Sequence, residues 1–101
     1  MSFDEFRESI GREAAPPAEW SGARRALWHE ARGDWETAHS CAQEDSSREG
    51  SWVHAHLHRK EGDVGNAGYW YARAGRTMPA AGVTPAAEWE KIARELCGSQ
   101  T

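Results

Sequence analysis

The sequence is poor in cysteine and in long apolar runs. Its two cysteines, Cys41 and Cys97, form no C-x-x-C motif and are too few for a disulfide framework. No apolar run approaches the roughly 20 residues that cross a membrane. Residues 1–10 are acidic and lack the basic-then-apolar order of a signal sequence. We therefore expect two buried thiols in a cytoplasmic protein that has no membrane partner.

Strong charge of one sign is missing as well. The 101 residues carry a formal net charge of −4. Only residues 50–80 are basic on balance, and the segments on both sides, residues 1–49 and 81–101, are acidic. Because nucleic-acid binding depends on a basic surface that neutralises phosphates, we do not expect a nucleic-acid partner.

Tryptophan, by contrast, is abundant. Six tryptophans stand in a chain of which only 39% is hydrophobic. Each such ring buries about 150–250 Å², so a few of them provide a core and argue against a disordered chain. Helical periodicity places Trp20, Trp70 and Trp89 inward. It assigns Trp28 and Trp52 no clear place in the core, which leaves these two as candidates for a surface.

Periodicity and capping residues predict one all-α domain over residues 1–101. No stretch of strand length alternates convincingly between apolar and polar residues. Ser2 and Glu5 form a capping-box pattern at the start, and Thr84 with Pro85 opens a last helix. The prediction is about six helices: an N-terminal helix in residues 1–14, two helix–turn–helix units in residues 17–75 and a C-terminal helix in residues 84–98, with a polar loop over residues 43–51 and an irregular connector over residues 75–85.

Two segments of the chain are similar to each other. Residues 26–38, ALWHEARGDWETA, align without a gap with residues 55–67, AHLHRKEGDVGNA, at an offset of 29 residues. Each segment contains a Gly-Asp pair, in which glycine relieves backbone strain in a turn and aspartate caps the next helix. A fixed offset with the same turn chemistry predicts a repeated helical hairpin.

The second hairpin resembles the tetratricopeptide repeat. The residues that carry the resemblance are Ala55, His58, the Gly62-Asp63 turn, Ala67, Tyr71 and Ala74. The offset of 29 differs from the 34 residues of that family, and the first hairpin has Ala42 where the family has an aromatic residue. Over about residues 20–75, the resemblance implies a tetratricopeptide-like stack of hairpins. Because two repeats leave open ends, we expect the terminal helices to cap them.

Residues 51–76 also resemble a group of small bacterial proteins. This second resemblance implies a location in the cytoplasm rather than an activity.

The most unusual chemistry lies in residues 52–73. His54 and His58 are four residues apart and share one face of a helix, whereas His56 points away. Two such histidines can bind a metal ion, and His29 or Cys41 can supply a third ligand. The alternative, which the residues favour, is that both rings are partly buried and hydrogen-bonded within the helix pair. Neither a metal nor another cofactor is therefore part of the prediction.

A second group of rings and cations follows on the next helix. Tyr69 and Arg73, four apart, share a flank beside Trp70, and such side chains can stack on a ligand or hold an anion. The alternative is that the rings are core and the arginines pair with carboxylates. The predicted binding residues of the whole segment are Trp52, His54, His58, Arg59, Tyr69 and Arg73.

Two hypotheses for the function come from these patterns. The first is a non-catalytic helical scaffold that binds a peptide or protein partner, or a second copy of itself, and rests on the repeat and the tryptophans. The second is a protein that binds a small molecule or a metal through residues 52–73. An enzyme is the less expected form of the second hypothesis, because the sequence has no G-x-S-x-G nucleophile motif and its paired acids lie at helix ends, where capping explains them.

Overall fold

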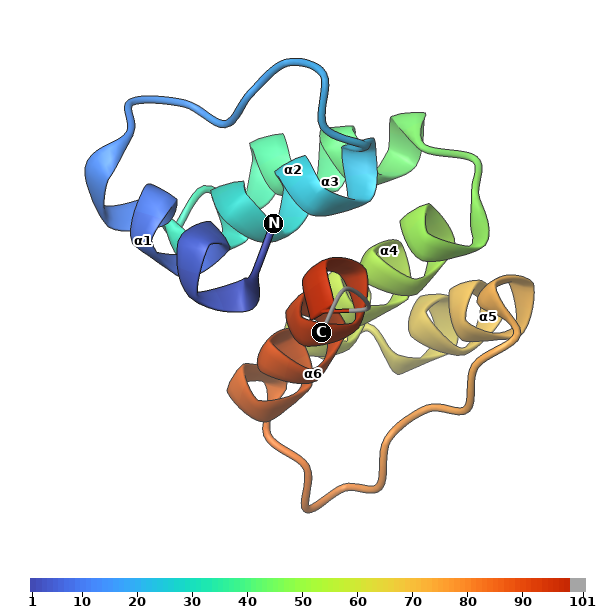
Figure 1. Cartoon of the computed structure of the whole chain (residues 1–101). Helices are drawn as coiled ribbons and strands as arrows, with labels where there is room; N and C mark the ends of the chain where they lie inside the picture. The colour runs from blue at the N-terminus through green and yellow to red at the C-terminus, as the bar shows by residue number, and fades with distance from the viewer. Residues whose placement is uncertain (99–101) are drawn as a thin grey trace.

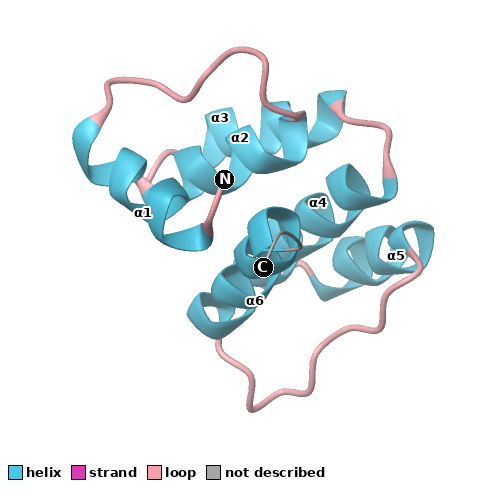
Figure 2. Ribbon diagram, in the orientation of Figure 1, coloured by secondary structure: helices cyan, strands magenta, loops and turns pink. Residues whose placement is uncertain are grey.

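The part of the chain that the structure describes folds into six helices. The computed structural model describes residues 1–98, and no strand occurs within that range. The helices are α1 (Phe3–Arg12), α2 (Gly22–Ala31), α3 (Trp35–Glu44), α4 (Arg48–Lys60), α5 (Val64–Ala74) and α6 (Pro85–Gly98) (Figures 1 and 2). The prediction of an all-α fold with six helices is confirmed. Within residues 1–98, no helix has the length and the apolar character needed to cross a membrane.

Two predicted boundaries differ from the structure. The second helix begins at Gly22 instead of residue 17. The Pro17 carbonyl accepts a hydrogen bond from the Trp20 amide in a turn, and Ser21 then caps α2. The polar segment 43–51 is mostly helical, and only residues 45–47 separate α3 from α4. The helical residues Gln43, Glu44, Arg48 and Glu49 are exposed and polar, so the segment carries no apolar period that would have marked a helix.

The two hairpin turns have the same geometry. Gly33 and Gly62 adopt left-handed φ angles of 82° and 83°. The side chains of Asp34 and Asp63 then accept hydrogen bonds from the backbone amides of Thr37 and Asn66. The offset of 29 residues thus holds in three dimensions, and it makes α2–α3 and α4–α5 two equivalent hairpins.

Alanines allow the hairpins to pack closely. Ala26 and Ala55 on the first helices, and Ala38 and Ala67 on the second helices, are all fully buried. The α3 helix lies against both α2 and α4, which joins the two hairpins side by side (Figure 1). This contact between α3 and α4 is the one that brings the candidate site together.

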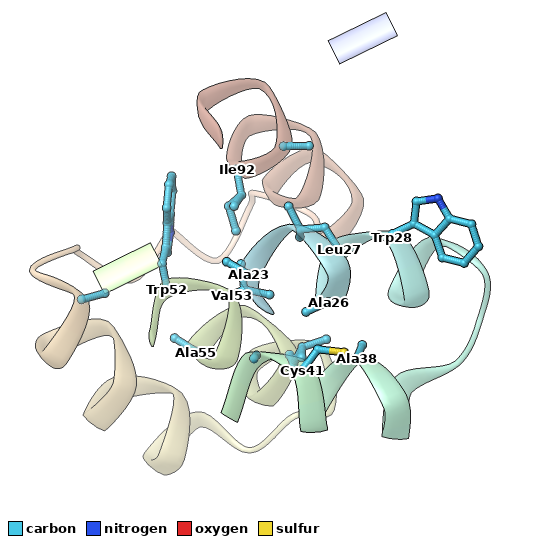
Figure 3. Close-up of a cluster of buried hydrophobic side chains, with 14 of the residues drawn as sticks. Ala23, Ala26, Leu27, Trp28, Ala38, Cys41, Trp52, Val53, Ala55 and Ile92 are labelled. Carbon is cyan, nitrogen blue, oxygen red and sulfur yellow. The ribbon is translucent and has the colours of Figure 1, made fainter. Parts of the chain in front are cut away.

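The terminal helices do not sit where the repeat predicted. The α6 helix, expected to cap an open end of the stack, lies across α2 and α4 instead. Ile92 of α6 points into the core that Leu27 and Val53 fill from those two helices (Figure 3). The α1 helix packs against α6, and Ser9 accepts a hydrogen bond from the Trp28 indole of α2 at 3.1 Å. The two terminal helices therefore complete the core rather than cover its ends.

The burial of the tryptophans also differs from the prediction. Trp28 and Trp52, expected at a surface, are 2% and 4% exposed. Trp20, Trp70 and Trp89 are only partly buried against the core. The reason is that α1 lies over Trp28, whose indole donates to Ser9, while α6 and the segment before it lie over Trp52. A helical period within a single element does not reveal these contacts.

Candidate metal centre

Three histidines meet between the two hairpins. His39 comes from α3, and His54 and His58 come from α4. Their ligand nitrogens all lie within 4.8 Å of one another, and the Nε2 atoms of His39 and His54 are 3.0 Å apart. The cluster therefore unites one side chain of the first hairpin with two of the second.

Local structure and packing explain why these rings face one another. His54 and His58 are one helical turn apart, and their rings stack with centroids 4.9 Å apart. Two indoles hold the cluster on either side. Trp35 stacks on His39 at 4.9 Å, and Trp70 of α5 stacks on His54 at 4.0 Å. The adjacent helices α3, α4 and α5 thus all contribute to the site (Figure 1).

The environment keeps two imidazoles of the cluster, His39 and His54, neutral. Burial, followed by the neighbouring His39 and His58, lowers the pKa of His54 to about 4. Burial and then His58 also lower the pKa of His39. His54 is 3% exposed, whereas His39 and His58 are partly exposed. His39 and His54 therefore offer neutral nitrogen ligands near neutral pH, as metal binding requires, and part of the cluster remains open to solvent.

A carboxylate lies behind one of the rings. His58 Nδ1 is 3.6 Å from Asp63 Oδ2. Asp63 remains ionised because the hydrogen bond from the Asn66 side chain, more than any other contact, lowers its pKa. A carboxylate beside the outer nitrogen of a ligating histidine orients the ring and raises its basicity. Asp63 therefore serves both the turn and the candidate site.

The chemistry of three imidazoles points to a particular class of metal. Imidazole nitrogen suits zinc, copper, nickel and iron, whereas magnesium and calcium prefer oxygen ligands. Three histidines around a tetrahedral zinc ion leave one position for water or another ligand. With zinc–nitrogen distances of about 2.0–2.1 Å, tetrahedral ligand atoms are roughly 3.3 Å apart. Separations of up to 4.8 Å within the cluster exceed this value, so the rings must move closer together to bind one ion.

Neither of the two candidates for a third ligand, His29 and Cys41, lies in the cluster. His29 lies edge-on to Trp28 with ring centroids 5.2 Å apart, and it does not join the cluster. The Cys41 sulfur accepts a hydrogen bond from Arg25 Nη1 at 3.5 Å, and burial raises the pKa of its thiol. The third histidine is His39, one turn after Trp35. That spacing was the available signal, because it places an imidazole on the same flank as an indole.

The other predicted binding residues do not form one site with the histidines. Trp52 contacts Arg76, whose guanidinium carbon is 3.7 Å from the indole centroid. Arg59 donates to Glu88 at 2.9 Å. Tyr69 and Arg73 contact each other on α5, where the Arg73 guanidinium donates to the Tyr69 hydroxyl at 3.4 Å. The predicted binding residues therefore lie in three different surroundings, although the segment 52–73 is continuous in sequence.

The sequence did not predict a buried charged network that lies on the other side of α4. His56 is fully buried between two carboxylates, 2.7 Å from Glu30 and 2.8 Å from Glu88. Burial opposes the charge on His56, but the hydrogen bonds to Glu30 and Glu88 outweigh burial and raise its pKa to about 9. Tyr71 donates to Glu88 at 2.5 Å, and Lys60 lies 3.2 Å from Glu30. This network joins α2, α4, α5 and α6 through charge-assisted hydrogen bonds.

Comparisons with family models, with curated proteins and with solved structures find no match for this chain.

Proposed function

We propose that this protein binds a transition-metal ion of the zinc class through His39, His54 and His58. One observation carries the proposal: three imidazoles from two hairpins place their ligand nitrogens within 4.8 Å of one another. It supports the second of the two hypotheses that the sequence raised. The role that fits is binding without catalysis.

Contact between neutral rings is the competing explanation for the cluster. The 3.0 Å approach of His39 and His54 fits an N–H···N hydrogen bond, which satisfies those two rings without an ion. That bond does not need His58, whose ring is stacked on His54 and lies near the Asp63 carboxylate. A metal ion gives all three rings and this carboxylate a common role.

Metal binding at this place would also stabilise the fold. The ion would link α3 to α4 and thereby hold the two hairpins together. Because a ligand that binds only the folded state adds to the free energy of unfolding, zinc is expected to raise Tm. At a free zinc concentration about 100 times Kd, the gain is about 2.7 kcal/mol.

Calorimetric titration of the untagged protein with Zn²⁺ at neutral pH tests the proposal. We expect one ion per chain, and a loss of affinity of tenfold or more in His39→Ala and in His58→Ala. Both substituted rings are partly exposed, so we expect both variants to fold. His29→Ala is the matched control, because it removes a partly exposed imidazole outside the cluster.

Two results would overturn the proposal. One is the absence of a Zn²⁺ binding isotherm in the wild-type protein, with Tm unchanged by Zn²⁺, Ni²⁺ and Cu²⁺. The other is an equal loss of affinity in His29→Ala and His39→Ala, which would place the ion elsewhere.

A second candidate function is self-association of the scaffold, which the exposed face of α5 favours. Tyr69 is 55% exposed and Val64 is 59% exposed, and Arg73 lies beside the Tyr69 ring. Tyrosine and arginine are frequent hot-spot residues of interfaces. Mass measurement at high concentration is expected to show a dimer that Tyr69→Ser disrupts. A monomer in both proteins would remove this candidate.

The cytoplasm is the compartment that we propose for either function. The two cysteines, Cys41 and Cys97, are buried thiols, and thiols persist in a reducing compartment.

A further inference from the structure

A pocket lies on the side of α4 that faces away from the histidine cluster. Trp52 precedes His54 by two residues, so their side chains point about 200° apart around the helix. The pocket is formed by α4, by α6 and by the segment between α5 and α6, which swings outside the helices (Figure 1). Its volume is about 380 Å³, within the range of about 300–1,000 Å³ that is typical of small-molecule sites.

The walls of this pocket are mainly apolar. Trp52 extends from α4 toward α6 (Figure 3), and Pro79, Val83 and Ala87 supply the other apolar surfaces. Trp52 is a large, nearly buried ring that nevertheless lines an open hollow. Apolar walls with a few polar groups are the usual composition of a site for a small organic ligand.

Two cations line the pocket, and both form an ion pair with the same carboxylate. Arg76 and Lys91 both line the hollow. The Arg76 guanidinium lies over the Trp52 ring, and its Nη2 and Nη1 atoms are 2.8 and 3.4 Å from the two oxygens of Glu95. Lys91 Nζ is 3.5 Å from the same carboxylate. The three side chains carry one net positive charge, although the whole molecule is acidic.

The carboxylate that also lines the pocket does not cancel this positive charge. Glu88 is 2% exposed, and its oxygens already accept from His56, Arg59 and Tyr71. One of these donors is the Arg59 guanidinium, a permanent cation whose Nη1 atom is 2.9 Å from Glu88 Oε1. Arg59 therefore compensates the charge of Glu88 at the floor of the pocket, and Arg76 and Lys91 decide which ligand charge is preferred.

We infer that this pocket binds a small organic monoanion with a planar apolar body, of the class of aromatic carboxylates. The ring system would lie against Trp52, Pro79 and Val83. The ligand carboxylate would take the place of Glu95 on Arg76 and Lys91. Because an exposed ion pair contributes little free energy, displacing Glu95 costs little, and a planar carboxylate suits the guanidinium fork. This site does not depend on the metal centre, which uses the opposite face of α4.

The test compares 2-naphthoate with its uncharged analogue 2-naphthamide by calorimetry. We expect the wild-type protein to bind the carboxylate about tenfold more tightly than the amide, as charge-assisted hydrogen bonds require. Arg76→Gln should abolish that preference. Glu95→Gln should strengthen naphthoate binding several-fold, because it releases both cations from their carboxylate.

A matched control is present on the same helix. Glu90 pairs with Arg94 at 2.8 Å and does not line the pocket. Glu90→Gln changes the net charge as much as Glu95→Gln does, and it should leave naphthoate binding unchanged. Equal effects of the two variants would show that only overall charge matters and would overturn the inference. Equal binding of naphthoate and naphthamide, or no naphthoate binding up to millimolar concentration, would overturn it as well.

Discussion

His56 is the residue on which the buried charges of this protein depend. Its two ring nitrogens lie within hydrogen-bond distance of Glu30 and Glu88, which come from α2 and α6. With a pKa near 9, the ring is a cation at neutral pH and donates through both nitrogens. One imidazolium thus compensates part of the charge of two carboxylates inside the core.

Replacing His56 is expected to be strongly destabilising. In His56→Ala, Glu30 and Glu88 lose the cation between them, and breaking a buried ion pair on one side costs about 3–5 kcal/mol. Denaturant unfolding followed by circular dichroism would measure this change. His29→Ala, the control, should lose much less, because its ring is partly exposed and outside the network. A similar small loss in both variants would contradict the assigned role of His56.

The pKa values of the histidines on α4 show the same dependence on surroundings. His54 and His56 are two residues apart, yet the pKa of His54 is lowered to about 4 and that of His56 is raised to about 9. Rings of other histidines surround the first, and carboxylates surround the second. The same side chain is therefore a candidate metal ligand at one position and a structural cation at the other.

At the scale of the element, α4 is the centre of the molecule. Eight consecutive residues of this helix, from Gly50 to Leu57, are buried. Its neighbours are α2, α3, α5 and α6, so each face has a different environment. One face carries the histidine cluster, another the charged network and a third the wall of the pocket that Trp52 lines. A helix buried on all sides allows these sites to coexist within about 13 residues.

Gly62 and Gly68 are expected to respond to substitution by alanine with opposite changes in stability. Gly62 has a left-handed φ of 83°, which strains any side chain, so Gly62→Ala should destabilise the protein by about 1–2 kcal/mol. Gly68 lies within α5, and an added Cβ there would make only an ordinary contact with Met78 at 3.9 Å. Gly68→Ala should therefore stabilise by about 0.5–1 kcal/mol, since alanine favours helix.

Thermal unfolding of the two glycine variants checks this prediction. The expected order of Tm is Gly68→Ala above wild type and wild type above Gly62→Ala. A Gly62→Ala protein as stable as wild type would mean that the turn does not require its left-handed residue.

At the scale of the whole molecule, stability should fall on both sides of a pH near 6.5. The pKa of His56 is raised from 6.5 to about 9, so its contribution is complete below pH 6.5 and is lost as the pH rises through 9. The pKa of His54 is lowered from 6.5 to about 4, so its contribution is complete above pH 6.5 and is lost as the pH falls toward 4. Each group alone changes the free energy of unfolding by about 1.4 kcal/mol per pH unit within its window.

Urea unfolding between pH 4.5 and 9, in the presence of a chelator, would measure this profile. The chelator removes metal ions, whose binding to the histidines would otherwise add its own pH dependence. His54→Gln should flatten the acid side and leave the alkaline side unchanged. A free energy of unfolding that increases from pH 6.5 to 9 would show that His56 is neutral in the folded protein.

The sequence predicted much of the architecture of the whole chain. Capping residues, glycines and helical periodicity gave six helices and the repeated hairpin, because these signals act between residues a few positions apart. The His54–His58 pair was predictable for the same reason. The tetratricopeptide resemblance stays a prediction, and so does the binding role of Trp52, Arg59, Tyr69 and Arg73.

Only the tertiary structure decided which faces meet. Helical periodicity indicates that His54 lies on one side of its helix. It does not indicate that His39 of the other hairpin lies next to His54. The burial of Trp52 and the charge of His56 likewise depend on α6, whose Glu88 is 32 residues from His56 in sequence. The amino-acid sequence by itself determined the helices and turns, since their hydrogen bonds are local. The histidine cluster, the charged network and the pocket exist only because packing brings distant helices together.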